Sequence, residues 1–135
     1  MKMKKIILVV DDSATNLELT TYLLEEAGFG ILKATNGLEA ITLARANRPD
    51  LVLCDIHMPG MDGLEVAQTL RNDPDLAHVP LIALTATAGP ADIPSMMAAG
   101  FMSFFEKPIS MAKFVDQVRQ YLDGETHVPL CEPAL

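Results

Sequence analysis

The segment Leu51-Val52-Leu53-Cys54-Asp55 is an apolar run that ends on a carboxylate. Three more apolar runs in the chain also lead into polar side chains. They are residues 6–10 before Asp11 and Asp12, residues 81–84 before Thr85, and residues 104–106 before Lys107. In an open parallel sheet, ligands bind beyond the carboxyl ends of the strands. If these runs are parallel strands, their polar ends converge on one pocket suited to a divalent cation and a phosphoryl group.

The segments between these runs have the spacing of amphipathic helices, and residues 31–34 form a further short apolar run. Strands that alternate with helices indicate βα units around a parallel sheet. With right-handed crossovers, five such units predict a flavodoxin-like three-layer α/β/α sandwich with five helices. Its five-stranded parallel sheet would have the order 2-1-3-4-5, with the switch point between strands one and three. Asp11, Asp12 and Asp55 end those two strands.

Local signals predict where the first two helices begin and which sides they bury. The first helix is capped by Ser13 or by Thr15, which makes a plausible capping box with Glu18, and Gly28 stops it. The second helix follows the Asn36-Gly37 turn, and its predicted inward residues are Leu38, Ile41 and Ala44.

The remaining elements complete one domain over residues 4–122. A third helix is expected over residues 64–70. Proline is tolerated only in the first turn of a helix, so Pro94 predicts a short fourth helix from about Asp92 to Ala99, ended by Gly100. A last amphipathic helix runs to residue 122, and residues 123–135 are expected to form a tail.

Composition narrows the function classes. The 135 residues fit one domain, and the net charge of −8 argues against direct nucleic-acid binding. Two cysteines give no disulfide framework and indicate a reducing compartment. The apolar stretch after the basic start covers only residues 6–10, too short for a signal-peptide core or a membrane span. A cytoplasmic protein without membrane contact is therefore expected.

Three ionised carboxylates in one pocket need a compensating charge. At an effective dielectric near 20, one pair ~4 Å apart costs about 4 kcal/mol before solvent relaxes. All-oxygen ligands favour Mg²⁺, or Mn²⁺, over zinc. Lys107 would add a charge for phosphate and Thr85 a hydroxyl donor, while Asp55 is the best candidate nucleophile. Taken alone, Asp11-Asp12 could equally be a helix N-cap; the agreement of four strand ends favours function.

The quoted motifs together resemble the receiver domain of two-component response regulators. The matching segments, in order and at family spacing over about residues 4–122, are Val9–Ser13, Pro49–Gly63, Pro80–Ala86 and Ala99–Pro108. This signal is far more specific than one short motif.

The resemblance implies a metal site and an acceptor. Asp55 would be the phosphoacceptor, and Asp12 would bind Mg²⁺ directly while Asp11 acts largely through water. The metal's third protein ligand would be the backbone carbonyl of His57, not its imidazole.

The resemblance also implies a phosphate site and a switch. Thr85, Ala86 and Lys107 would bind the phosphoryl group. Thr85 would then move toward it and Phe104 would fill the vacated space, altering the surface of the fourth helix, fifth strand and fifth helix. The Lys107-Pro108 bond resembles one that is usually cis in the family.

These expectations describe a signalling module, not an enzyme, that assists its own phosphorylation and dephosphorylation. A sensor histidine kinase or a histidine phosphotransfer protein would supply the phosphoryl group, and an unidentified downstream protein would read it. The chain would be a monomer or weak homodimer. It would be either free-standing or part of a hybrid kinase, because Asn16 and residues 83–86 resemble receivers of that type. The alternative, a haloacid-dehalogenase-like phosphohydrolase, expects its nucleophile on the first strand and a second Asp two residues on, where this chain has Ser13.

Overall fold

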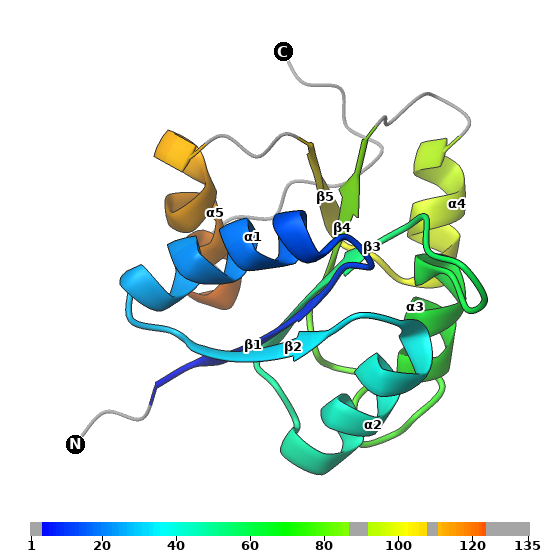
Figure 1. The fold of residues 1–135 in the computed structure, drawn as a ribbon. Helices are drawn as coiled ribbons and strands as arrows, with labels where there is room; N and C mark the ends of the chain where they lie inside the picture. Colours follow the sequence, from blue (N-terminus) through cyan, green and yellow to red (C-terminus); the bar gives the residue numbers. More distant parts are fainter. Residues whose placement is uncertain (1–3, 87–91, 108–110, 124–135) are drawn as a thin grey trace.

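Five parallel strands form one sheet, flanked on both faces by helices (Figure 1). The computed structural model describes residues 4–86, 92–107 and 111–123. The strands are β1 (Ile6–Val10), β2 (Gly30–Ala34), β3 (Leu51–Asp55), β4 (Leu81–Thr85) and β5 (Ser103–Glu106). The helices are α1 (Ala14–Glu26), α2 (Gly37–Asn47), α3 (Gly63–Arg71), α4 (Asp92–Ala99) and α5 (Met111–Asp123). The strand order is β2-β1-β3-β4-β5, which confirms the predicted fold.

Alternate strand residues feed two separate apolar cores, which makes the three layers. Leu8, Val52 and Ala83 face the core beneath α2, α3 and α4. Ile7 and Leu53 face the core beneath α1 and α5. Strands buried on both faces read as continuous apolar runs, which is why β1, β3 and β4 are recognisable in the sequence. Within the described ranges, no helix has the length and apolar character needed to cross a bilayer.

The start of α1 differs from the predicted capping box. Ser13 is the N-cap, and its Oγ accepts from the Asn16 N–H at 3.4 Å. The Ser13 N–H in turn donates to Asp11 Oδ1 at 2.9 Å, which fixes the chain in an extended conformation at Ser13. The helix therefore begins at Ala14, and the box of Thr15 with Glu18 was wrong. Gly28, with φ of 98°, follows the helix as expected.

The inward face of α2 differs from the predicted stripe at its first residue. Ile41 and Ala44 are buried as expected, and Gly37 and Ala40 join them. Leu38 is 69% exposed, so its predicted inward orientation was wrong. Gly37 is buried against Met61, since a Cβ there would come within 2.7 Å of Met61 Cγ. Leu38 is consequently rotated about 100° away from the core.

Helix α4 spans Asp92–Ala99 as predicted, and Arg71 fixes its end. The Arg71 guanidinium donates from Nη2 to the Gly100 carbonyl at 2.7 Å and from Nη1 to the Val79 carbonyl at 3.1 Å. One side chain thus joins α3, the segment that leads into β4 and the segment that leads into β5. The Lys107-Pro108 bond and residues 124–135 lie outside the described residues.

Candidate functional site

Three carboxylates meet at the carboxyl edge of the sheet. Asp11 and Asp12 directly follow β1, and Asp55 is the last residue of β3. The two strands are neighbours, with Val10 paired to Cys54. One ligand atom from each acid lies within 4.8 Å of the others. The sheet order therefore produces the convergence that the strand ends predict.

The three acids have different surroundings. Asp11 is completely buried and Asp55 is 5% exposed, whereas Asp12 faces solvent. Asp55 Oδ1 accepts from the His57 N–H at 3.1 Å. This bond orients the Asp55 carboxylate through the backbone of the β3–α3 loop (residues 56–62), and the His57 side chain itself is exposed.

Lys107 brings a positive charge to the two buried acids. Its Nζ donates to Asp55 Oδ2 at 3.1 Å and forms an ion pair with Asp11 Oδ2 at 2.9 Å. The Lys107 N–H donates to the Thr85 carbonyl at 2.8 Å, which anchors the residue just beyond β5. The ammonium thus lies between the ends of β1 and β3.

Burial and charge shift the titration of this group of side chains. Burial raises the pKa of Asp55, and the hydrogen bond and charge of Lys107 oppose that rise, while Asp11 adds to it. Burial alone would lower the pKa of Lys107, but its interactions with the Asp11 and Asp55 carboxylates outweigh this and raise it. Lys107 is therefore held as a cation, and one ammonium must balance more than one carboxylate.

The residues fit a hard divalent cation. Asp11 Oδ2 is buried without an aligned hydrogen bond in the described structure, since its 2.9 Å contact with Lys107 is an ion pair only. A buried carboxylate oxygen in this state has a lone pair free for a cation. The donors of the acidic cluster are all oxygens, and Asp12 adds an exposed one. This chemistry suits Mg²⁺ or Mn²⁺ and not zinc, which favours histidine and cysteine.

The other predicted site residues lie on β4 and β5. Thr85 is buried at the end of β4, and Ala86 follows it at the surface. Phe104 is half-buried on β5 and packs against the core beneath α4. All of these residues are next to the edge where the three acids meet, or on the strand that leads to it.

The start of α3 is a part of the site that sequence reasoning missed. Asp62 caps α3 through a complete capping box with Glu65. Gly63 donates its N–H to the Ile56 carbonyl at 2.9 Å, and a Cβ on Gly63 would lie 2.3 Å from the Asp55 backbone oxygen. The spacing of Asp62 and Glu65 is a recognisable capping signal. The close approach of Gly63 to Asp55 has no such local signature.

Comparison with known proteins finds one family. The family model described as the response regulator receiver domain matches residues 7–119. The polar-differentiation response regulator DivK of Brucella anthropi is 40% identical over 120 residues, which cover 89% of this chain and 98% of that protein.

Solved structures show the same fold. The signal receiver domain of a signal transduction histidine kinase from Syntrophus aciditrophicus has a TM-score of 0.82 and 33% identity, covering 97% of this chain and 99% of that one. The chemotaxis protein CheY4 of Vibrio cholerae has a TM-score of 0.84 and 25% identity, covering 87% and 98%.

Proposed function

The chain belongs to the response regulator receiver domain family, and on this premise we propose that it carries a phosphoryl group on Asp55 in two-component signalling. The observation that carries the proposal is the Lys107 ammonium, which contacts both the Asp55 and the Asp11 carboxylates. In the transfer, an Asp55 carboxylate oxygen attacks phosphorus in line. The bond from phosphorus to the donor's histidine nitrogen breaks, and its electron pair stays on that nitrogen.

The surrounding residues align the phosphoryl group and balance its charge. Lys107 is held in its charged form and would pair with a phosphoryl oxygen once the transfer has consumed a carboxylate charge. Thr85 and Ala86, at the end of β4, would contact the other oxygens through the hydroxyl and the backbone. Because phosphoryl transfer depends mainly on positioning and charge neutralisation, such contacts can supply most of the catalysis.

A divalent cation would be held by Asp11, Asp12, Asp55 and the carbonyl of His57. When bound, Mg²⁺ would neutralise the crowded acids and the incoming phosphoryl oxygens. Asp12, the exposed acid, would bind the metal directly, and buried Asp11 would act largely through water.

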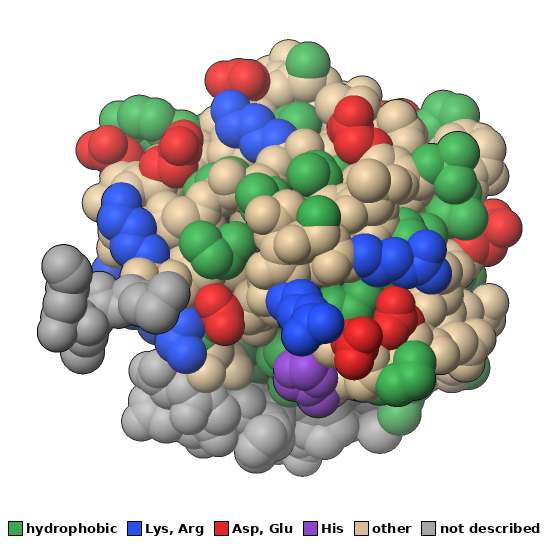
Figure 2. All heavy atoms as spheres, turned by 90° about the horizontal axis from the view of Figure 1, so that it is seen from below, with side chains coloured by type: hydrophobic (Ala, Val, Ile, Leu, Met, Phe, Trp, Pro, Cys, Tyr) green, Lys and Arg blue, Asp and Glu red, His purple; other side chains and the backbone are tan. Residues whose placement is uncertain are grey.

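The proposed partners are proteins. A sensor histidine kinase or a histidine phosphotransfer protein would donate the phosphoryl group, and a downstream protein would recognise the result. Figure 2 shows basic and acidic side chains interspersed on one face, not the continuous basic area that nucleic acid requires. With the net charge of −8, this disfavours direct nucleic-acid binding. The proposed protein is a cytoplasmic monomer or weak homodimer.

Incubation with acetyl phosphate and Mg²⁺ tests the proposal. Intact-mass measurement should show one labile phosphoryl adduct, which hydroxylamine removes because it cleaves acyl phosphates. With EDTA in place of Mg²⁺ the adduct should be absent or strongly reduced. Lack of any adduct in the presence of Mg²⁺, acetyl phosphate and a panel of histidine kinases would overturn the proposed function.

The switch is expected to depend on Thr85. Phosphorylation adds about −1.5 to −2 charges at Asp55, which favours movement of the Thr85 hydroxyl toward it. Phe104 would then occupy the vacated space and change the surface of α4, β5 and α5.

Replacing Thr85 by alanine should leave phosphorylation of Asp55 within about fivefold of wild type, since hydroxyl contacts are typically worth ~1 kcal/mol. The phosphorylation-dependent chemical-shift changes of α4, β5 and α5 should shrink in NMR spectra of this variant. Identical changes in the variant and the wild type would show that Thr85 does not carry the switch.

A further inference from the structure

A mainly apolar groove lies beside the acceptor loop and has no role in phosphoryl transfer. Its volume is about 380 Å³, and it separates the start of α2 from the β3–α3 loop. Its lining residues are Asn36, Gly37, Leu38, Pro59, Gly60, Met61 and Glu65. Concave, largely apolar sites with a few polar groups are the usual form of a binding site.

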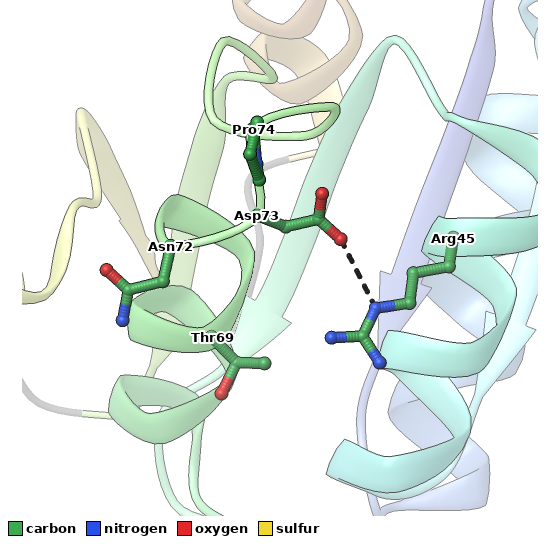
Figure 3. A pocket seen from close by; sticks show the side chains of 5 residues that line it. All are labelled: Arg45, Thr69, Asn72, Asp73 and Pro74. Atoms are coloured by element: carbon green, nitrogen blue, oxygen red, sulfur yellow. Dashed lines mark hydrogen bonds and ion pairs between the residues drawn. The ribbon is translucent and has the colours of Figure 1, made fainter.

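A second pocket, between α2 and the end of α3, has a different character (Figure 3). It is polar, and its Arg45 is already neutralised by Asp73, with Nε and Oδ2 3.2 Å apart. This pocket therefore presents no unpaired cation that would select an anionic ligand. The apolar groove is the stronger candidate for recognition.

Leu38 forms the exposed wall of the groove. At 69% exposure it is the most exposed large hydrophobic residue in the described part of the chain, above Tyr22 at 58% and Leu19 at 41%. A single exposed leucine is ordinary. This one faces a groove that Pro59 and Met61 continue, so the apolar surface is contiguous.

The rim of the groove is acidic. Glu65 lines it, and Glu39 and Asp62 are next to lining residues in the sequence. Both glutamates are exposed, and neither forms an ion pair within the described residues. No lysine or arginine is among the lining residues. The groove therefore complements an apolar side chain that has cationic neighbours.

The floor of the groove is connected to Asp55. Met61 packs on Gly37, and both lie in the lining. The same loop holds Asp55 through the His57 N–H at 3.1 Å and joins α3 at Gly63. An occupant that presses on Met61 and Pro59 thus acts on the segment that orients the acceptor carboxylate.

We propose that this groove docks an apolar anchor, of leucine type, on a basic segment of a regulatory protein, and that docking changes the rate of Asp55 phosphorylation. Docking of the basic segment in the groove requires no phosphoryl group. Its effect on the rate of Asp55 phosphorylation rests on the proposed function. By linkage, any change in affinity on phosphorylation acts equally in the other direction.

The probe is a short fluorescein-labelled helical peptide with a leucine pair on one face and arginines beside it. Binding to the unphosphorylated protein is followed by fluorescence anisotropy at low and high salt. Leu38→Ser should weaken binding about tenfold, as expected when a buried leucine contact is lost. Leu19→Ser, the same change on exposed α1, should have no effect.

Charge is tested with the double variant Glu39→Gln and Glu65→Gln. Glutamine keeps the hydrogen bonds that Glu39 accepts from Thr35 and Glu65 accepts from Asp62, so both helix starts are preserved. Binding at low salt should fall about threefold, and its salt dependence should decrease. A peptide with glutamates in place of the arginines should not bind.

Rate coupling is tested with acetyl phosphate. The arginine-leucine peptide should change the phosphorylation rate of wild type at least about twofold and leave the rate of Leu38→Ser unchanged. Failure of the peptide to bind, or equal sensitivity to Leu38→Ser and Leu19→Ser, overturns the docking site. Binding without a rate change overturns the coupling. Absence of phosphorylation in all samples would instead contradict the proposed function, because the binding measurement does not depend on it.

Discussion

Asp55→Asn should abolish formation of the phosphoryl adduct with acetyl phosphate and with any phosphohistidine donor. Asparagine has no carboxylate oxygen to attack phosphorus, and loss of a nucleophile in enzymes that rely on one reduces the rate by about 10³-fold or more. The neighbouring acids are poor substitutes. Asp11 is completely buried and paired with Lys107, and Asp12 is exposed, whereas the His57 N–H orients Asp55 alone of the three acids in the described structure.

The variant should remain folded, so that loss of the adduct reports on chemistry. Asparagine has the same shape, and its Oδ1 can still accept one of the two hydrogen bonds, from His57 or Lys107, that Asp55 accepts. It also removes one charge from a buried acidic group, which offsets part of the lost ion pair. Far-UV circular dichroism and urea unfolding should therefore resemble those of wild type.

Asp116→Asn is the matched control. It removes the same charge from an exposed position on α5 and should be phosphorylated like wild type. An adduct of equal yield on Asp55→Asn would assign the acceptor to another residue. Peptide mapping after reductive trapping would then identify that residue.

The sheet and the site could be predicted from the sequence for the same reason. Strands β1, β3 and β4 are buried on both faces and read as unbroken apolar runs, and their polar residues stand where the runs stop. The carboxyl ends of parallel strands lie at one edge of the sheet, so Asp11, Asp55 and Thr85 could be assigned to that edge without side-chain coordinates.

Features that depend on packing between segments were not predictable in this way. Leu38 fits an inward pattern by spacing, but α2 buries Gly37 against Met61 and leaves Leu38 exposed. In the sequence Arg71 resembles an ordinary basic residue in the last turn of a helix, but its guanidinium donates hydrogen bonds to the carbonyls of Val79 and Gly100. Both depend on residues distant in sequence, which local periodicity cannot register.

Gly63→Ala should destabilise the protein and impair phosphorylation together. A Cβ at this position would lie 2.3 Å from the Asp55 oxygen, 2.8 Å from Ile56 Cα and 3.0 Å from the Asp55 carbonyl carbon. All three atoms are backbone, so no side chain can rotate away. Relief requires α3 to move from the end of β3, at a cost of about 1–3 kcal/mol for an overpacked site.

The displacement would act directly on the acceptor. Moving Gly63 stretches its 2.9 Å hydrogen bond to the Ile56 carbonyl, and Ile56 is the residue between Asp55 and the His57 N–H that orients it. A carboxylate misplaced by about 1 Å can lose ~10²-fold in rate. Urea unfolding gives the stability change, and the initial rate with acetyl phosphate gives the functional change.

Gly28→Ala separates these two effects. Gly28 has φ of 98° and no neighbour within 4 Å of an added Cβ, so alanine there costs about 1–2 kcal/mol of backbone strain without a clash. Gly28 lies in the turn after α1, remote from the acidic site. It should therefore lose comparable stability and keep the wild-type phosphorylation rate. If Gly63→Ala behaved like Gly28→Ala in both measurements, the close approach of α3 to Asp55 would not be what positions the acceptor.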